Sequence, residues 1–158
     1  MSSPILDMID HGLWAGAAAI CFAVLLNVPV RALAACGLTG LLGYETRTLL
    51  TATEQVTSAP ASLVAAVLVS LFGVACGRKL HAPAVIFVIP GIIPLVPGAL
   101  AYRTIAGLMS ALSATAETQQ AAVAAVVENA LRTTVITAAL ATGVALPSML
   151  LRRRRPML

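Results

Sequence analysis

Prolines and glycines crowd one apolar stretch of this sequence. The pairs Pro90-Gly91 and Pro97-Gly98 flank Pro94 in a segment otherwise made of Ile, Leu and Val. Each proline removes a backbone donor and clashes with the preceding turn, at a cost of about 3 kcal/mol in a helix interior. In a bilayer, backbone groups freed in this way must be covered by protein or line a cavity. A broken apolar helix is therefore the best sequence-level indication of a transport site.

The helix that restarts after such a break has a start suited to binding an anion. We expect the chain to leave the helix at Pro90-Gly91 and to begin a new helix near Pro97-Gly98. The new start would carry unpaired N–H groups and partial positive charge, which suit a carboxylate. Tyr102, one turn on, would add a hydroxyl. The alternative is a kinked packing helix without a ligand. The predicted substrate-pathway residues here are Pro90, Gly91, Pro94, Pro97, Gly98 and Tyr102.

Two further polar residues flank a proline between apolar segments. Asn27 and Arg31 lie on either side of Pro29. Asn27 is predicted to line the pathway, and Arg31 to pair with an anionic substrate. The alternative is a helix end at which Arg31 extends to the lipid headgroups.

Other ionisable groups lie inside apolar segments, where burying them is costly. Glu45 and Arg47 are expected to form an interfacial pair, and the alternative is that Glu45 couples transport to protons. Glu128 and Arg132 are four residues apart, a spacing that permits an ion pair on one helix face. They too are candidates for charge or proton coupling. Asn129 is predicted to face inward and support the pathway.

The sequence has no motif of a catalytic nucleophile, a metal site or a nucleotide-binding loop. Cys21, Cys36 and Cys76 lie in apolar surroundings without a CxxC spacing, as small buried residues do. His11 and His81 alone would have to complete any metal site. We therefore expect no metal, no cofactor and no enzymatic activity.

Composition places the chain in a membrane. Of its 158 residues, 59% are hydrophobic and 10% are charged, with a mean hydropathy of +0.97. A soluble domain carries about a quarter charged residues. The net charge of +4 equals the four arginines at 152–155, so nucleic acid is not an expected partner. Such a cluster after an apolar helix is typical of a cytoplasmic, lipid-contacting end.

The hydropathy pattern predicts an all-α, polytopic membrane helix bundle with about five spans. These are residues 13–28, 30–50, 61–77, the broken segment 83–109, and a long helix from about 121 to 151. Residues 1–158 would form one domain with a basic cytoplasmic tail at 152–158. With the N-terminus outside and the C-terminus inside, Arg31, Arg78 and Lys79 fall inside, and the acidic residues of the loops and the N-terminus fall outside. A four-span alternative leaves 30–50 uncrossed.

Two stretches carry a resemblance to a known family. The runs from Leu26 to Leu33 and from Val88 to Tyr102 resemble the threonine/serine exporter family, and more narrowly its small, separately encoded membrane subunit, of the type paired with a larger subunit in bacterial two-component succinate export. The resemblance implies a multi-pass subunit of the bacterial inner membrane that needs a larger partner of the same family. It implies a small carboxylate-bearing substrate, either a succinate-like dicarboxylate or threonine and serine.

Three alternatives remain at this stage. The chain could be a non-transporting assembly subunit, or a homo-oligomeric channel joined through the glycines at positions 37, 40 and 43. Those glycines recur every three residues, and a small-residue face permits close helix contact. A membrane enzyme is the least favoured.

Overall fold

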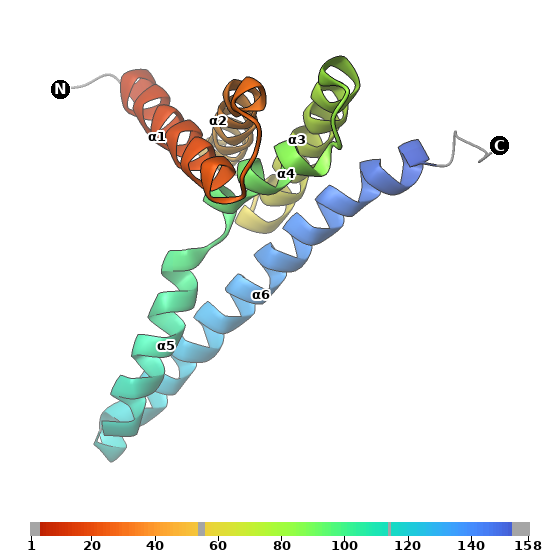
Figure 1. Cartoon of the computed structure of the whole chain (residues 1–158). Coiled ribbons are helices and arrows are strands. Elements are labelled where there is room, and N and C mark those ends of the chain that lie inside the picture. Colours follow the sequence, from red (N-terminus) through yellow and green to blue (C-terminus); the bar gives the residue numbers. More distant parts are fainter. Residues whose placement is uncertain (1–3, 54–55, 114, 153–158) are drawn as a thin grey trace.

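The structure is a computed structural model that describes residues 4–53, 56–113 and 115–152, and this part of the chain contains helices and no strands (Figure 1). The all-α prediction is confirmed. The tail from 153 onward and Glu54 lie outside the described residues. The elements are α1 (Pro4–Leu25), α2 (Val30–Ala52), α3 (Ser58–Leu80), α4 (Val85–Ile92), the short 3₁₀ helix η1 (Ile93–Leu95), α5 (Gly98–Ser113) and α6 (Ala116–Arg152).

Within the described residues, three helices are long and apolar enough to cross a membrane. They contain Met8–Leu25, Ser58–Leu80 and Thr118–Leu150, and the bent pair Val85–Leu95 and Gly98–Ser113 makes a fourth span if it counts as one. The 23 residues of α2 are long enough to cross, but its charged residues and threonines make it more polar than these. The chain is therefore a multi-pass helical protein. That residues 30–50 also cross the membrane, which would bring the total to five spans, stays a prediction.

The predicted break between α1 and α2 is confirmed. Backbone hydrogen bonds at this break satisfy the last carbonyls of α1. Asn27 adopts a left-handed φ of 58°. The N–H of Val28 donates to Ala23 O at 3.0 Å, and the N–H of Asn27 donates to Val24 O at 2.9 Å. This pair of bonds is the Schellman motif, which satisfies the last carbonyls of a helix. Asparagine is one of the few non-glycine residues that adopt this conformation readily.

Glycines let α2 approach α1 closely. A Cβ added to Gly40 would lie 2.5 Å from Ala19 Cβ and 3.0 Å from Ala15 O. One added to Gly37 would lie 2.8 Å from Ile20 Cδ1. Gly43 turns the other way, toward Val69 of α3 and Leu95 of η1. The small-residue face is thus used inside the chain, and the channel alternative loses the surface on which it depended.

The helix does not break at Pro90-Gly91, and this part of the prediction is wrong. Both residues lie within α4, which continues to Ile92. Proline at 90 removes the N–H that would bond to Ile86 O, and Cys36 Sγ of α2 contacts that carbonyl at 3.3 Å. A Cβ on Gly91 would lie 2.7 Å from Thr39 Cβ, so α2 and α4 touch nearly backbone to backbone. Contacts from α2 compensate for the proline.

The break comes later, at Val96-Pro97, and the predicted restart near Gly98 is confirmed. After η1, Val96 adopts an extended conformation with ψ of 131°. The axes on the two sides of the break are bent by 49°. The chain therefore changes direction once, immediately before α5.

The last helix begins earlier than expected, at Ala116 rather than near residue 121. Its 37 residues correspond to a length of about 55 Å in regular α-helical geometry. Helix α5 packs against the first part of α6, and this hairpin extends away from α1–α4 (Figure 1). The second part of α6 packs on α3, where a Cβ added to Gly143 would lie 2.7 Å from Ala66 Cβ. The core at this junction consists of Ala65, Ala66, Leu95, Ile136 and Leu140.

Candidate functional site

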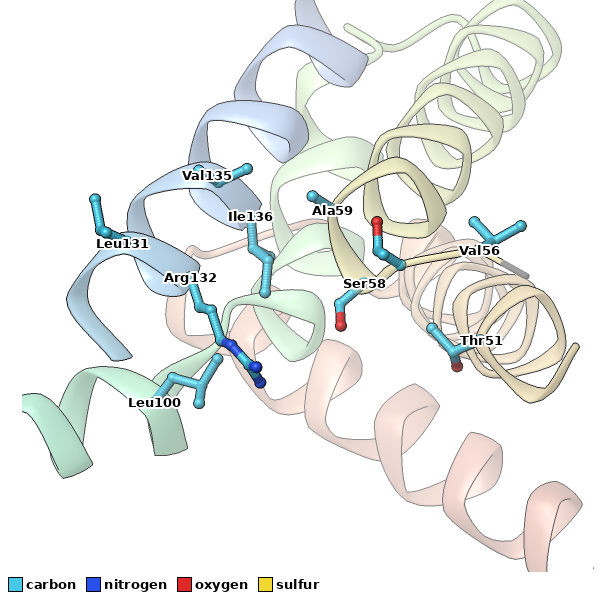
Figure 2. Close-up of a pocket in the computed structure, with 10 residues that line it drawn as sticks. Thr51, Val56, Ser58, Ala59, Leu100, Leu131, Arg132, Val135 and Ile136 are labelled. Atoms are coloured by element: carbon cyan, nitrogen blue, oxygen red, sulfur yellow. The ribbon is translucent and has the colours of Figure 1, made fainter. Parts of the chain in front are cut away.

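A cavity of about 650 Å³ lies where the hairpin meets the rest of the chain (Figure 2). It is an open cavity, bordered by the end of α2, the loop after it, the start of α3, the first turn of α5 and the middle of α6. Its lining combines hydroxyl groups, aliphatic side chains and one cation: Thr51, Val56, Thr57, Ser58, Ala59, Leu100, Leu131, Arg132, Val135 and Ile136. Ligand cavities typically measure about 300–1,000 Å³ and are mostly apolar with a few placed polar groups.

The start of α3 provides one polar wall of the cavity. Thr57 is its N-cap, with extended φ and ψ of −67° and 161°, and no side chain caps this end. The first N–H groups of the helix, from Ser58 and Ala59, therefore have no side-chain acceptor, while Pro60 has no N–H. An uncapped start of a 23-residue helix carries partial positive charge and favours an anion.

Arg132 provides the cation. In Figure 2 its side chain extends from α6 past Leu100, toward the space that Ser58 faces from α3. Its Nη2 binds Glu128 Oε1 at 2.6 Å, which confirms the predicted ion pair one turn apart. Both side chains remain largely exposed, at 66% for Arg132 and 61% for Glu128. A guanidinium has five N–H donors in a planar fork, so the pair leaves donors for a second carboxylate.

The predicted binding site at the start of α5 contributes little to the cavity. Leu100 lines it, but Gly98 and Tyr102 do not. Both are exposed, and a Cβ on Gly98 would meet nothing within 4 Å. Because Gly98 and Tyr102 are four residues apart, they share one helix face, while Leu100 lies on the other. Their role in the pathway stays a prediction.

The other predicted pathway residues do not line the cavity. Asn27 ends α1, and Arg31 is exposed in the first turn of α2. Pro90 and Gly91 belong to the contact between α4 and α2, and Pro94 lies in η1 and is half-buried. Asn129 is half-buried on α6 next to Glu128. Of the predicted residues, Arg132 is the one that the structure brings into the cavity wall.

Sequence reasoning missed the role of Arg47. The expected interfacial pair with Glu45 is not formed. Two residues apart on a helix, the side chains leave on different faces. Arg47 Nη1 instead donates to Leu95 O at 2.9 Å. That carbonyl has lost its helical partner because the chain leaves the helix at Val96. A count of the carbonyls freed by the Pro/Gly run would have called for such a donor.

A second cavity, of about 480 Å³, lies at the opposite end of α3. Arg78, His81 and Pro83 are among the residues that line it. His81 ends α3 in the left-handed region, with φ of 51°, and the N–H of Ala82 donates to Gly77 O at 2.9 Å. The described residues contain no group of three His, Cys, Asp or Glu side chains able to hold a metal ion.

Within the described part of the chain, three apolar helices are long enough to span a bilayer, a fourth apolar segment is bent at Val96-Pro97, and a cavity with a few polar groups lies beside that bend. These features are typical of a multi-pass membrane transport protein. The comparison with protein families is consistent with this class. The model of the family Threonine/Serine exporter, ThrE matches residues 11–150. The chain therefore belongs to this exporter family, as its sequence resemblance predicted. No solved structure matches it.

Proposed function

We propose that the chain is the membrane subunit of a secondary exporter for small metabolites that carry a carboxylate. The cavity between the start of α3 and Arg132 is the observation that carries this proposal. A guanidinium binds a carboxylate through two parallel hydrogen bonds, and a helix N-terminus adds N–H donors and partial positive charge. The aliphatic lining from Leu100, Leu131 and Val135 suits the carbon skeleton of such a metabolite. A succinate-like dicarboxylate, threonine or serine fits this description.

The two cavities support a transport role over a purely structural one. They lie at opposite ends of α3. The length of this helix is about 34 Å, close to the thickness of a bilayer core. With the N-terminus outside, the cavity at Arg132 lies toward the outer face and the one at Arg78 toward the inner face. A carrier needs access from both faces without a continuous passage between them.

The proposal includes a partner and a location. The resemblance to the small, separately encoded subunits favours a larger membrane subunit of the same family as partner, in the bacterial inner membrane. A homo-oligomer is the other assembly to test. An assembly role without transport remains a distinct candidate, and the experiment below separates it.

The test is efflux of labelled succinate and labelled threonine from cells that contain this chain alone, the larger family member alone, or both. We expect efflux with both. Arg132→Ala should lower efflux per assembled complex by about tenfold to a hundredfold, the equivalent of about 1.5–3 kcal/mol for hydrogen bonds to a charged group. Arg132→Lys keeps the charge without the planar fork, so its efflux should lie between that of the wild type and that of Arg132→Ala.

Arg103→Ala is the matched control, because Arg103 is exposed on α5 and does not line the cavity. Its efflux should equal that of the wild type. Wild-type efflux from Arg132→Ala would remove the cavity from the pathway. Fewer assembled complexes with unchanged efflux per complex would favour the assembly role.

A further inference from the structure

The carboxyl group of Glu45 lies in the contact between α1 and α2. Its Oε1 is buried and has no hydrogen-bond partner among the described residues. Directly opposite is the buried Gly12 of α1. A Cβ on Gly12 would overlap Glu45 Oε1 and would lie 2.8 Å from its Cδ. The carboxyl group therefore occupies the room that the missing side chain of Gly12 leaves between the two helices.

The arginines and lysines of the helices around Glu45 lie away from its carboxyl group. Arg47, the nearest in sequence, is engaged with Leu95 O on another face of α2. On the facing helix, Asp10 and His11 are the two residues before Gly12, and both are exposed. Helix α4 and η1 carry no titratable side chain, and the basic residues of α3 lie in its last turn, far from the end of α2. The titratable side chains of α1, α2 and α3 are Asp7, Asp10, His11, Cys21, Arg31, Cys36, Tyr44, Glu45, Arg47, Cys76, Arg78 and Lys79.

A charged carboxylate oxygen that is buried without a donor is more costly than the same oxygen in a neutral acid. The contact with Gly12 thus offers Oε1 no donor that would stabilise a negative charge. Loss of the proton would require water or a donor to reach Oε1, and hence a loosening of the α1–α2 contact. A group that is stable neutral in one arrangement and charged in another links proton binding to that change of arrangement.

We propose that Glu45 is the proton-binding site that couples this exporter to a proton gradient. The consequence for transport rests on the export function proposed above, whereas the proton site itself does not. Thr51 lines the cavity of Arg132, and it lies further along α2 than Glu45 by about 9 Å of helix axis. Glu45 and the cavity therefore lie at the same end of α2, on one helix. Protonation would close α1 on α2, and deprotonation would release it while the cavity exchanges its substrate.

The first test detects the proton without any transport. Infrared spectra of the purified full chain in lipid, recorded across a range of pH, should contain a C=O band of a protonated carboxylic acid. That band should disappear as the pH rises and should be missing in Glu45→Gln. Asp10→Asn is the matched carboxyl-to-amide control, and it should keep the band because Asp10 is exposed. A band that survives in Glu45→Gln, or the absence of any titrating band, would overturn the assignment.

The second test separates coupling from export. In vesicles that hold the chain with its larger subunit, Glu45→Gln should lose net export driven by a pH gradient but retain exchange of labelled for unlabelled substrate. Asp10→Asn should keep both activities. Gly12→Ala, which pushes on Oε1, should shift the pH dependence of net export relative to the wild type. Gradient-driven export by Glu45→Gln at the wild-type level would refute the coupling role.

The two failures are distinguishable. If the wild type moves neither succinate nor threonine while its infrared band titrates and depends on Glu45, the proton site stands and the proposed substrate class fails. If the wild type exports substrate but its spectrum does not depend on Glu45, the export function stands and this inference fails.

Discussion

Two glycines in apolar helices of this protein occupy opposite environments. A side chain on Gly40, in the α1–α2 contact, would meet Ala19 Cβ at 2.5 Å and Ala15 O at 3.0 Å. A side chain on Gly98, at the start of α5, would meet nothing within 4 Å. The first glycine is required by packing, while packing leaves the second unexplained. The difference separates a part of the molecule that must fit together from a part that faces open space beside the cavity.

The largest effect is expected at Gly40. Gly40→Leu would drive α1 and α2 apart, because backbone as well as side-chain atoms stand in the way. The cost should exceed the roughly 1–3 kcal/mol of ordinary overpacking. We expect little or no folded protein after extraction into detergent, as measured by size-exclusion chromatography of a fluorescent fusion. A monodisperse wild-type yield would show that α1 and α2 do not need this contact.

Gly98→Leu should give the opposite result. Because the new side chain enters open space, the yield and the thermal unfolding midpoint should match those of the wild type. If the pathway passes the start of α5, export should be abolished, measured as labelled substrate leaving cells with both subunits. Ala141→Leu, a similar enlargement at an exposed position of α6, is the control and should export normally. Normal export by a folded Gly98→Leu would exclude Gly98 from the pathway.

An intermediate effect on stability is expected at Arg47, which connects the two regions. Arg47→Leu would leave the buried Leu95 O without its donor. An unpaired buried acceptor costs about 1–3 kcal/mol, so the thermal unfolding midpoint in detergent should fall. Arg47→Lys, which keeps a donor on a shorter side chain, should recover part of the loss. An unchanged midpoint in Arg47→Leu would mean that water or lipid satisfies this carbonyl equally well.

The same contrast explains what could be read from the sequence. The break at Asn27 and the restart at Gly98 follow from local backbone rules, so a short window of sequence predicts both. The continuous helix through Pro90-Gly91 does not follow from local rules. The carbonyls of α4 are instead bonded by Cys36 and Thr39 of α2, about fifty residues earlier in the chain. The local sequence shows the cost of a proline, but it does not show which distant side chain offsets that cost.

The candidate site shows the same division between local and distant information. The Glu128–Arg132 pair was predictable from its spacing on one helix. That Arg132 would line a cavity with Ser58 was not, since it depends on how α6 packs against α3 and α5. The early start of α6 was missed because residues 116–120 are mostly polar. The structure shows that α6 begins at Ala116, and the N–H groups of Thr118 and Gln119 donate to Thr115 O.

The smallest effect is expected at Asn27, and it tests whether a local break has a function. Glycine adopts a positive φ without steric cost, so Asn27→Gly should leave the unfolding midpoint nearly unchanged. Asn27→Ala should lower the free energy of unfolding by about 1 kcal/mol, because alanine lacks the short polar side chain through which asparagine tolerates the left-handed conformation.

If Asn27 serves only to end α1, export by Asn27→Gly should equal that of the wild type when labelled efflux is measured. A loss of export without a loss of stability would instead place the amide in the substrate pathway. In that case, the residue that ends α1 would also take part in transport.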